Sequence, residues 1–466
     1  MNAILTMSSF LFPLITFPYV SRVLLPAGTG KVSFATSLIS YFSMFAQLGI
    51  PTYGIRICAK VRDNREELTR TAHELLLINL ITNIVSYAAL IIVLLKVPQL
   101  REDRLLYVIV SFNIILTSVG MEWLYKALEQ YTYITVRSII FKFVALIFMF
   151  LLVHEQDDYV IYGGISIFAA SASNLFNLIN VHKYIDLKPV GNYNVKRHIK
   201  AVFVFFAMAC ATTVYTNLDT VMLGFMTTDQ EVGYYNAAVR IKSILVSIVT
   251  SLGTVLLPRA SYYVQLKQMG KFREISKKAL NFVFLVAVPL MVYFIVFAEE
   301  GIYFLSGENY TSSIVPMQII MPTLLFIGIT NILGMQILVP LGYENIVLYS
   351  EVAGAITDLV LNWILIPHYG AAGAAAGTLA AELVVLLIQA GCLGKRIWYA
   401  FRSVHYLRIL AGTGWGVMGS LWVKNLSLTY FLMMVLSAAL FFGIYFIFMI
   451  VMKEELILEL IDSLKR

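Results

Sequence analysis

Charged residues are scarce in this chain of 466 amino acids, at 13%, whereas hydrophobic residues make up 59%. A soluble protein of this length has too little interior to hold so much apolar surface. A lipid bilayer removes that conflict, because each helical crossing needs about 20 apolar residues. The scarcity of charge therefore predicts an integral membrane protein.

Cysteine is also rare. Cys58, Cys210 and Cys392 are far apart and belong to no C-x-x-C motif or Cys/His cluster. We therefore predict no disulfide framework and no metal site, and expect free, buried thiols. The six histidines lie at or near the ends of apolar runs, which argues against a histidine proton relay through the membrane.

Motifs for nucleotide binding and hydrolysis are missing. The chain has no Walker loop, no G-x-S-x-G and no H-E-x-x-H. We therefore predict no catalytic residue, no cofactor and no enzymatic activity, and the missing nucleotide site argues against an ATP-driven pump. The outer connectors are too short for the active site of a membrane polymerase or transferase.

Long apolar runs fill most of the chain, and their length excludes a barrel, whose strands alternate over about 10 residues. The sequence predicts an all-α integral membrane fold with about fourteen transmembrane helices. Several runs contain Pro or Gly, which membrane helices tolerate. The expected spans are 2–24, 32–55, 72–95, 105–125, 133–153, 159–182, 201–226, 232–258, 279–298, 313–341, 346–366, 371–394, 406–422 and 428–452.

Positive charge is unevenly divided between the two sides of this topology. Most of the 34 Lys and Arg lie in connectors of one side, and the net charge of +7 is a topology signal that gives no reason to expect nucleic-acid binding. The positive-inside rule puts this side, with both termini, in the cytoplasm. The basic connectors are 56–70, 126, 183–200, 259–278, 395–408 and 453–466.

The chain is expected to fold as two six-helix lobes followed by two further helices. We place the N-terminal lobe at 1–182, a cytoplasmic linker at 183–200, the C-terminal lobe at 201–394 and helices 13 and 14 at 395–452. Residues 453–466 are expected to form a cytoplasmic amphipathic tail. Gly120-Met121-Glu122 matches Gly334-Met335-Gln336, and Gly30 matches Gly233, which suggests a duplication. Chance similarity between apolar sequences is the alternative.

Four cations lie inside the apolar runs, where each costs roughly 2.5–3.5 kcal/mol on insertion scales. They are Arg137 and Lys142 in the fifth span, and Arg240 and Lys242 in the eighth. One hypothesis is a cationic lumen that receives an anionic headgroup. The alternative is structural ion pairing or snorkelling, most plausible for Arg137 near a membrane edge. Arg240 and Lys242 diverge by about 200° around a helix, so we expect one of the pair to face the cavity.

Two acids inside the runs are candidates for ion coupling. Asp219 lies in a polar patch of an otherwise apolar helix, and either pairs with Arg240 or titrates with a coupling ion. Glu122 lies near the cytoplasmic end of its span, where a headgroup-level anchor is as plausible as a functional role.

Several segments across both halves carry a family resemblance: PLITFPYVSRVLLPAGTGKVSFATSLISYF (13–42), GMEWLYKALEQYTYITVRSIIFK (120–142), YTNLDTVMLG (215–224) and EVGYYNAAVRI (231–241). On these segments the chain resembles bacterial polysaccharide repeat-unit flippases of the multidrug/oligosaccharidyl-lipid/polysaccharide exporter superfamily. One turn departs from the pattern. Where the family commonly has Val-Leu-Gly-Pro-x-Gly, this chain has Leu25 in place of the first glycine, so we expect that outer turn to differ.

The resemblance implies a MATE-like fold with a cavity between pseudo-symmetric lobes. It implies a flippase that moves polyprenyl-pyrophosphate-linked oligosaccharide from the inner to the outer leaflet of the bacterial cytoplasmic membrane, for surface polysaccharide biosynthesis. Arg137, Lys142 and Arg240 would bind the pyrophosphate or acidic sugars. If an ion gradient drives the exchange, Asp219 or Glu122 would bind the coupling ion. A polysaccharide polymerase is a possible partner. The alternatives are a multidrug/ion antiporter and a peptidoglycan-precursor flippase of the same superfamily.

Overall fold

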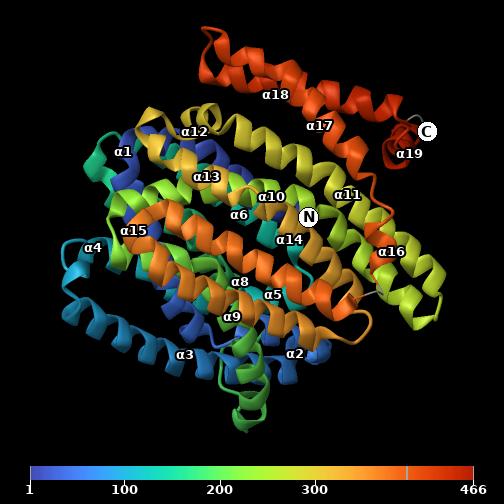
Figure 1. Cartoon of the computed structure of the whole chain (residues 1–466). Helices are drawn as coiled ribbons and strands as arrows, with labels where there is room; N and C mark the ends of the chain where they lie inside the picture. The colour runs from blue at the N-terminus through green and yellow to red at the C-terminus, as the bar shows by residue number, and fades with distance from the viewer. Residues whose placement is uncertain (1, 395–396, 465–466) are drawn as a thin grey trace. The chain divides into compact units, whose positions relative to one another are not determined.

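The structure is a computed structural model that describes residues 2–394 and 397–464 (Figure 1). Every regular element in these two ranges is a helix, and neither range contains a strand. The prediction of an all-α membrane fold is confirmed. The chain forms two compact units, Met1–Gly233 and Tyr234–Arg466, which we describe separately. This division falls after the 183–200 linker, and the predicted lobe boundaries stay a prediction.

The first unit is built from long helices joined by short connectors. Its main helices are α1 (Asn2–Gln47), α2 (Ile50–Val61), α3 (Arg65–Lys96), α4 (Arg104–Val119), α5 (Glu122–Ala127), α6 (Tyr131–Leu152), α7 (Tyr159–Ile167), α8 (Asn174–Asn180) and α9 (Lys196–Met226). A π-helical segment, Phe168–Ala172, joins α7 to α8.

The second unit follows from α10 onward. Its helices are α10 (Asp229–Gln265, beginning at the end of the first unit), α11 (Met269–Val296), α12 (Ala298–Ser306), α13 (Ile314–Ile320), α14 (Thr323–Asn331), α15 (Glu344–Leu393), α16 (Trp398–Phe401), α17 (Tyr406–Ser420), α18 (Tyr430–Val451) and α19 (Glu455–Leu464). Figure 1 shows α17 and α18 running beside each other. A second π-helical segment, Ile332–Leu338, follows α14.

The described residues contain nine helices that are long and apolar enough to cross a membrane. A tenth crossing is possible if Glu308–Ile320 and Thr323–Leu338, bent by 42°, form one broken span. The exact number of fourteen therefore stays a prediction. The chain is a multi-pass membrane protein.

Two of the longest helices are each interrupted once. At 1.5 Å per residue, the 46 residues of α1 would extend about 69 Å, more than twice the ~30 Å of a bilayer core. The backbone of α1 breaks at Leu25 (φ 58°, ψ 178°), and that of α15 breaks at Gly370 (φ 50°, ψ −127°). Glycine adopts such a φ without steric cost, whereas the Cβ of leucine makes it costly. Leu25 therefore has a backbone conformation that glycine would adopt more readily, and the expectation that this outer turn differs from the family's stays a prediction.

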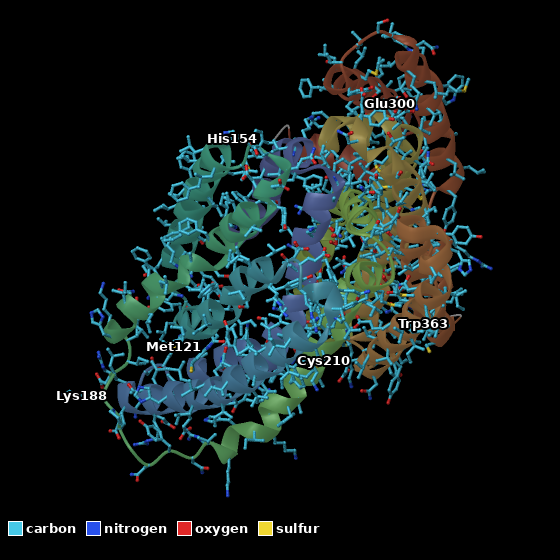
Figure 2. The ribbon with its side chains drawn as sticks, turned by 90° about the vertical axis from the view of Figure 1, so that its left-hand side faces the viewer. Met121, His154, Lys188, Cys210, Glu300 and Trp363 are labelled. Atoms are coloured by element: carbon cyan, nitrogen blue, oxygen red, sulfur yellow. The ribbon has the colours of Figure 1, made fainter. Side chains whose placement is uncertain are left out.

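Charged groups of the first unit gather at its two ends. One end carries Lys31, whose Nζ lies 3.0 Å from Asp103 Oδ1, and the connector with His154. The other end carries the 183–195 connector, where Arg65 pairs with Asp186 at 2.9 Å. Figure 2 shows His154 and Lys188 at opposite ends of the unit. The expected separation of polar ends by apolar helices is therefore present in this unit.

The expectation of buried thiols is confirmed for Cys58 and is wrong for the other two cysteines. All three are free, but only Cys58 is buried, while Cys210 is half-buried and Cys392 is exposed. Cys392 lies in the last turn of α15, just before Gly394, where neighbouring side chains leave it uncovered.

The predicted C-terminal amphipathic segment is helical in α19. Ile457 packs into the hydrophobic core of the second unit, and Lys278 on α11 pairs with Glu459 at 2.7 Å. Part of the apolar face of α19 is therefore held against the protein.

Candidate functional site

Ionised side chains meet where α5 and α6 approach each other. Glu122 begins α5, and its carboxylate lies 2.8 Å from Lys126 Nζ and 3.4 Å from Arg137 Nη2 on α6. The Glu122 carboxylate also attracts Lys142 electrostatically, and Lys142 is half-buried further along α6. We call Glu122, Lys126, Arg137 and Lys142 the α5–α6 cluster. Its cations outnumber its carboxylate, so the cluster carries excess positive charge.

The α8 helix fixes the geometry of this cluster. Asn174 accepts a hydrogen bond from Arg137 Nη1 at 3.0 Å, and Asn177 donates to the carbonyl of Gly120 at 2.7 Å. The guanidinium also lies 6.0 Å from the ring centre of Tyr133. Arg137 is only 7% exposed, so the guanidinium is held in place before any ligand arrives. The structural ion pair proposed as the alternative for Arg137 is therefore present.

The other predicted residues lie elsewhere. Asp219, on α9 in the first unit, is 8% exposed. Arg240 and Lys242 are half-buried on α10 in the second unit. The structure brings Glu122, Arg137 and Lys142 together within one unit, and the predicted pairing of Asp219 with Arg240 stays a prediction. A receiving role for these cations also stays a prediction.

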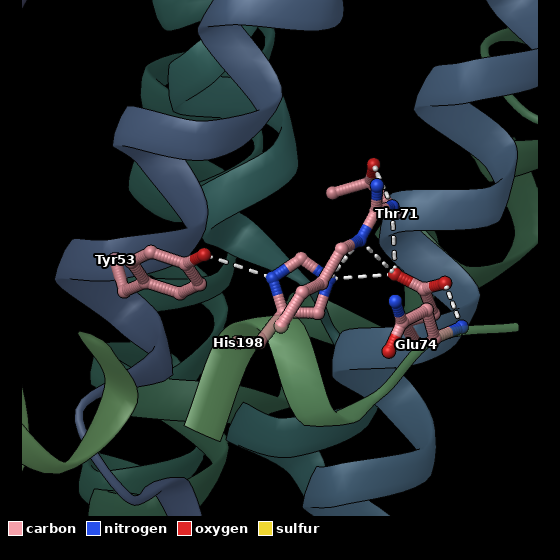
Figure 3. A network of polar contacts seen from close by, with 6 residues as sticks. Tyr53, Thr71, Glu74 and His198 are labelled. Atoms are coloured by element: carbon pink, nitrogen blue, oxygen red, sulfur yellow. Dashed lines mark hydrogen bonds and ion pairs between the residues drawn. The ribbon is translucent and has the colours of Figure 1, made fainter. Parts of the chain in front are cut away.

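A second polar network joins α3 to the start of α9 (Figure 3). The Glu74 side chain is fully buried, and its carboxylate accepts from the backbone N–H of Asn194 at 2.6 Å and from Arg197 Nε at 2.8 Å. Glu74 also lies 2.6 Å from His198 Nε2, while the other ring nitrogen of His198 lies 2.8 Å from the Tyr53 hydroxyl. The network ties α2, α3 and α9 together at the basic end of the unit.

The second unit contains a related network. Glu454, also fully buried, lies 2.7 Å from His405 Nδ1 and 2.6 Å from Asn281 Nδ2. Asn281 on α11 and His405 before α17 follow Glu74 and His198 by the same number of residues. Each unit thus contains a histidine that contacts a buried glutamate, but in the second unit the glutamate comes from the residues between α18 and α19. The duplication suggested by the sequence stays a prediction.

Sequence reasoning missed the Glu74 network. Glu74 lies in the first part of α3, close enough to the helix end to pass for a headgroup-level residue. His198 lies at the edge of an apolar run, and its partners are more than a hundred residues away along the chain. Only their separate positions at span edges were visible in the sequence.

The fold and the site define a class of protein: a multi-pass helical membrane protein with ionised groups buried among its spanning helices. The chain belongs to the family described as polysaccharide biosynthesis protein, whose model matches residues 1–264, more than half of the chain. The MatE family model matches residues 205–364.

Curated relatives are similar over most of the chain. A putative O-antigen transporter of Escherichia coli (strain K12) is 24% identical, over 82% of this chain and 92% of its own length. A putative O-antigen transporter of Shigella dysenteriae is 25% identical, over 82% of this chain and 96% of its own length. A probable low-salt glycan biosynthesis flippase, Agl15 of Haloferax volcanii, is 22% identical over 54% of this chain and 47% of its own length.

A solved structure has a similar fold. It is described as lipid II flippase MurJ, inward closed conformation, and it matches with a TM-score of 0.74 and 16% sequence identity. The match covers 97% of this chain and 99% of the other. At this identity the similarity establishes the fold alone, and it confirms the MurJ/MATE-like architecture.

Proposed function

We propose that the protein is a flippase for lipid-linked oligosaccharides. It moves polyprenyl-pyrophosphate-linked repeat units from the cytoplasmic to the outer leaflet by alternating access, for surface polysaccharide biosynthesis. The observation that carries this proposal is the excess positive charge of the α5–α6 cluster, because ionised groups within spanning helices commonly mark the path of a charged substrate. The names of the O-antigen transporter relatives support the substrate class.

The basic residues divide into two roles. Lys142 and one of Arg240 and Lys242 meet a pyrophosphate or an acidic sugar, and the half-buried positions of all three side chains support this role. Arg137 is held by Asn174 and Glu122, and we propose that it contributes positive potential from a fixed position. A fixed charge loses little conformational entropy when the substrate binds.

Asp219 and Glu122 are the candidates for coupling to an ion gradient. Glu122 already neutralises part of the charge of Lys126 and Arg137, so protonating it would release both cations. Asp219 is buried in a spanning helix, where binding and release of a cation would change the local charge. Either acid could thus link substrate release to ion movement.

We place the protein in the bacterial cytoplasmic membrane with both termini in the cytoplasm, because the basic connectors would then lie inside. We propose transport without enzymatic activity, with a polysaccharide polymerase as a possible partner that receives the flipped repeat units. The transporter and flippase names of the relatives support transport.

The test is export in a strain that lacks the gene. Replacing Arg137, Lys142 and Arg240 together with Ala should abolish surface polysaccharide while the protein level in the membrane stays normal. A matched control replaces Lys60, Lys183 and Lys267 with Ala, because these cations are exposed on connectors or short helices. Normal export by the first variant would refute the proposed roles of these cations.

The same strain separates the alternatives. A multidrug/ion antiporter would restore resistance in a drug-susceptibility panel without restoring surface polysaccharide. A peptidoglycan-precursor flippase would instead rescue growth of cells depleted of their own flippase for that precursor. Either result without polysaccharide export would overturn the proposed substrate.

A further inference from the structure

A cavity of about 540 Å³ lies in the first unit between α3, α4 and α8, beneath the 187–193 part of the connector before α9. Its volume falls in the range of about 300–1,000 Å³ that is typical of small-molecule sites. None of the cations and acids proposed for transport lines it. We call it the α3–α4 groove.

The groove opens among apolar side chains that other parts of the protein leave uncovered. Leu80 on α3 is 58% exposed, Ile115 on α4 is 44% exposed and Leu178 on α8 is 42% exposed, and all three line it. These residues belong to helices long and apolar enough to span a membrane. We infer that their exposed surfaces face hydrocarbon, so that a hydrocarbon chain can enter the groove without displacing ordered polar contacts.

The wall of the groove also contains an unsatisfied polar group. Asn79 is 4% exposed, and its side-chain oxygen has no hydrogen-bond partner among the described residues. The neighbouring Asn83 and Ser118 bond to each other at 2.9 Å, so they do not satisfy it. An unpaired amide oxygen in an apolar setting is costly. By rotation, the amide can present a donor or an acceptor to a bound molecule.

A histidine and two basic residues lie at the connector end of the groove. His73 lines it, and its Nδ1 lies 3.0 Å from the Tyr193 hydroxyl, which leaves Nε2 available on the other side of the ring. Arg70 lies one helical turn before His73 on the same face. Its Nη2 pairs with Glu66 Oε1 at 2.8 Å, while its buried Nε has no partner among the described residues. Lys188 lies between two lining residues of the connector, at the outer edge of the unit (Figure 2).

We propose that the α3–α4 groove binds one anionic phospholipid of the surrounding leaflet. Its phosphate lies near Arg70, His73 and Lys188, and one acyl chain occupies the groove. The Asn79 amide lies about 9 Å further along α3 than His73, and after rotation its Nδ2–H donates to an ester carbonyl of the lipid. Basic pockets between transmembrane helices suit such headgroups.

The lipid holds the connector against α3. Leu187, Pro189 and Tyr193 line the groove, and the connector leads directly into α9, which Glu74 ties to α3. A bound chain adds apolar contact to both sides of this junction. We therefore expect anionic phospholipid to stabilise the protein, and this effect does not depend on which substrate is transported.

The experiment uses the purified full chain in detergent, titrated with phosphatidylglycerol or with phosphatidylcholine of the same acyl chains. Native mass spectrometry counts retained lipids, and a thermal melt measures stability. We expect one phosphatidylglycerol to be retained at a concentration at least about tenfold below that needed for phosphatidylcholine, a difference of about 1.4 kcal/mol. Equal retention of the two lipids would refute the proposal.

Variants locate the lipid. Leu80→Trp fills the groove and should remove both the retained lipid and its thermal stabilisation. Ile84→Trp is the control, because Ile84 lies one turn further on α3, is 62% exposed and does not line the groove. Both variants should elute as the wild type does on size exclusion, and loss of lipid from both would contradict the site.

Two further arms test the charge and the source of the ligand. The double variant Arg70→Gln/Lys188→Gln should weaken phosphatidylglycerol binding by about tenfold, and unchanged binding would contradict the proposed headgroup position. Competition with undecaprenyl phosphate separates phospholipid from substrate-like lipid. If this polyprenyl phosphate displaces phosphatidylglycerol at lower concentration, the groove is a tail site for the transported lipid and the phospholipid proposal is wrong.

Discussion

The carboxylate of Glu74 lies 2.6 Å from Nε2 of His198, so two helices whose sequences are more than a hundred residues apart are held together at the basic end of the first unit (Figure 3). The Glu74 side chain is fully buried, and His198 is 1% exposed. A buried carboxylate is stable only when donors surround it. Asn194, Arg197 and His198 supply those donors from the start of α9 and the residues before it.

We expect Glu74→Gln to lower the free energy of unfolding by about 1–3 kcal/mol, since hydrogen bonds to a charged group are replaced by weaker ones. The measurement is a denaturant or thermal melt of purified protein in detergent. Glu102→Gln is the control, because Glu102 is exposed on the connector before α4 and a surface change of this kind shifts stability by at most about 0.5 kcal/mol. Equal stability of the two variants would contradict the role of the network.

At Arg137, we expect export to fall in the order wild type, Arg137→Lys, Arg137→Ala. Lysine keeps the positive charge but loses the paired contacts with Asn174 and Glu122. Alanine loses the charge as well as these contacts. Losing one charge-assisted hydrogen bond, about 1.5–3 kcal/mol, corresponds to at least about tenfold slower export if the contact acts in the rate-limiting step. Surface polysaccharide is measured against the membrane level of each variant. Full export by Arg137→Ala would show that the residue has no part in transport.

At the break in α1, we expect Leu25→Gly to be more stable than Leu25→Ala. Both substitutions remove the leucine side chain, but only glycine relieves the backbone at φ 58°. A non-glycine residue in such a conformation costs on the order of 1–3 kcal/mol. Thermal melts of the two variants, compared with wild type, measure the difference. A lower melting temperature for Leu25→Gly than for Leu25→Ala would show that this backbone is not strained.

Thiol labelling distinguishes the buried cysteine from the exposed one by its reactivity. Burial raises the pKa of the Cys58 thiol to about 12, so it stays protonated at pH 7–9, and the thiolate forms only as the pH approaches 12. The thiolate is the reactive form. In a Cys210→Ala background, we expect maleimide at pH 7.5 to label Cys392 and to leave Cys58 unmodified, as measured by mass spectrometry of the peptides. Rapid labelling that persists after Cys392→Ser would contradict the burial of Cys58.

Gly30 allows a close backbone approach. A Cβ at this position would collide with the backbone carbonyl of Asp229 and lie 2.9 Å from the nitrogen of Gly233. We expect Gly30→Ala to destabilise the protein by about 1–3 kcal/mol, since backbone atoms cannot move aside cheaply. Gly443→Ala on α18 is the control, because a Cβ there has no neighbour within 4 Å. Similar melting temperatures for the two variants would refute the close packing at Gly30.

Much of the fold could be predicted from the sequence. Only helices and closed barrels satisfy their backbone hydrogen bonds inside a bilayer, and the long apolar runs of this chain exclude a barrel. The resemblance also located the turn at Leu25. The candidate site was predicted in part. Arg137 and Glu122 could be identified from the sequence because a charge inside an apolar run is costly. Their mutual contact and the hydrogen bond from Arg137 to Asn174 could not be predicted.

The sequence by itself determined the membrane class, the helical fold and the separation of basic connectors from apolar spans, since these depend on local composition and on the transfer free energy of each segment. Only the tertiary structure decided which charges meet. The contact of Glu74 with His198, the hold of Asn174 on Arg137 and the groove beside Asn79 depend on helix packing between residues far apart in the chain. No local pattern encodes that packing, because it follows from how whole helices fit together.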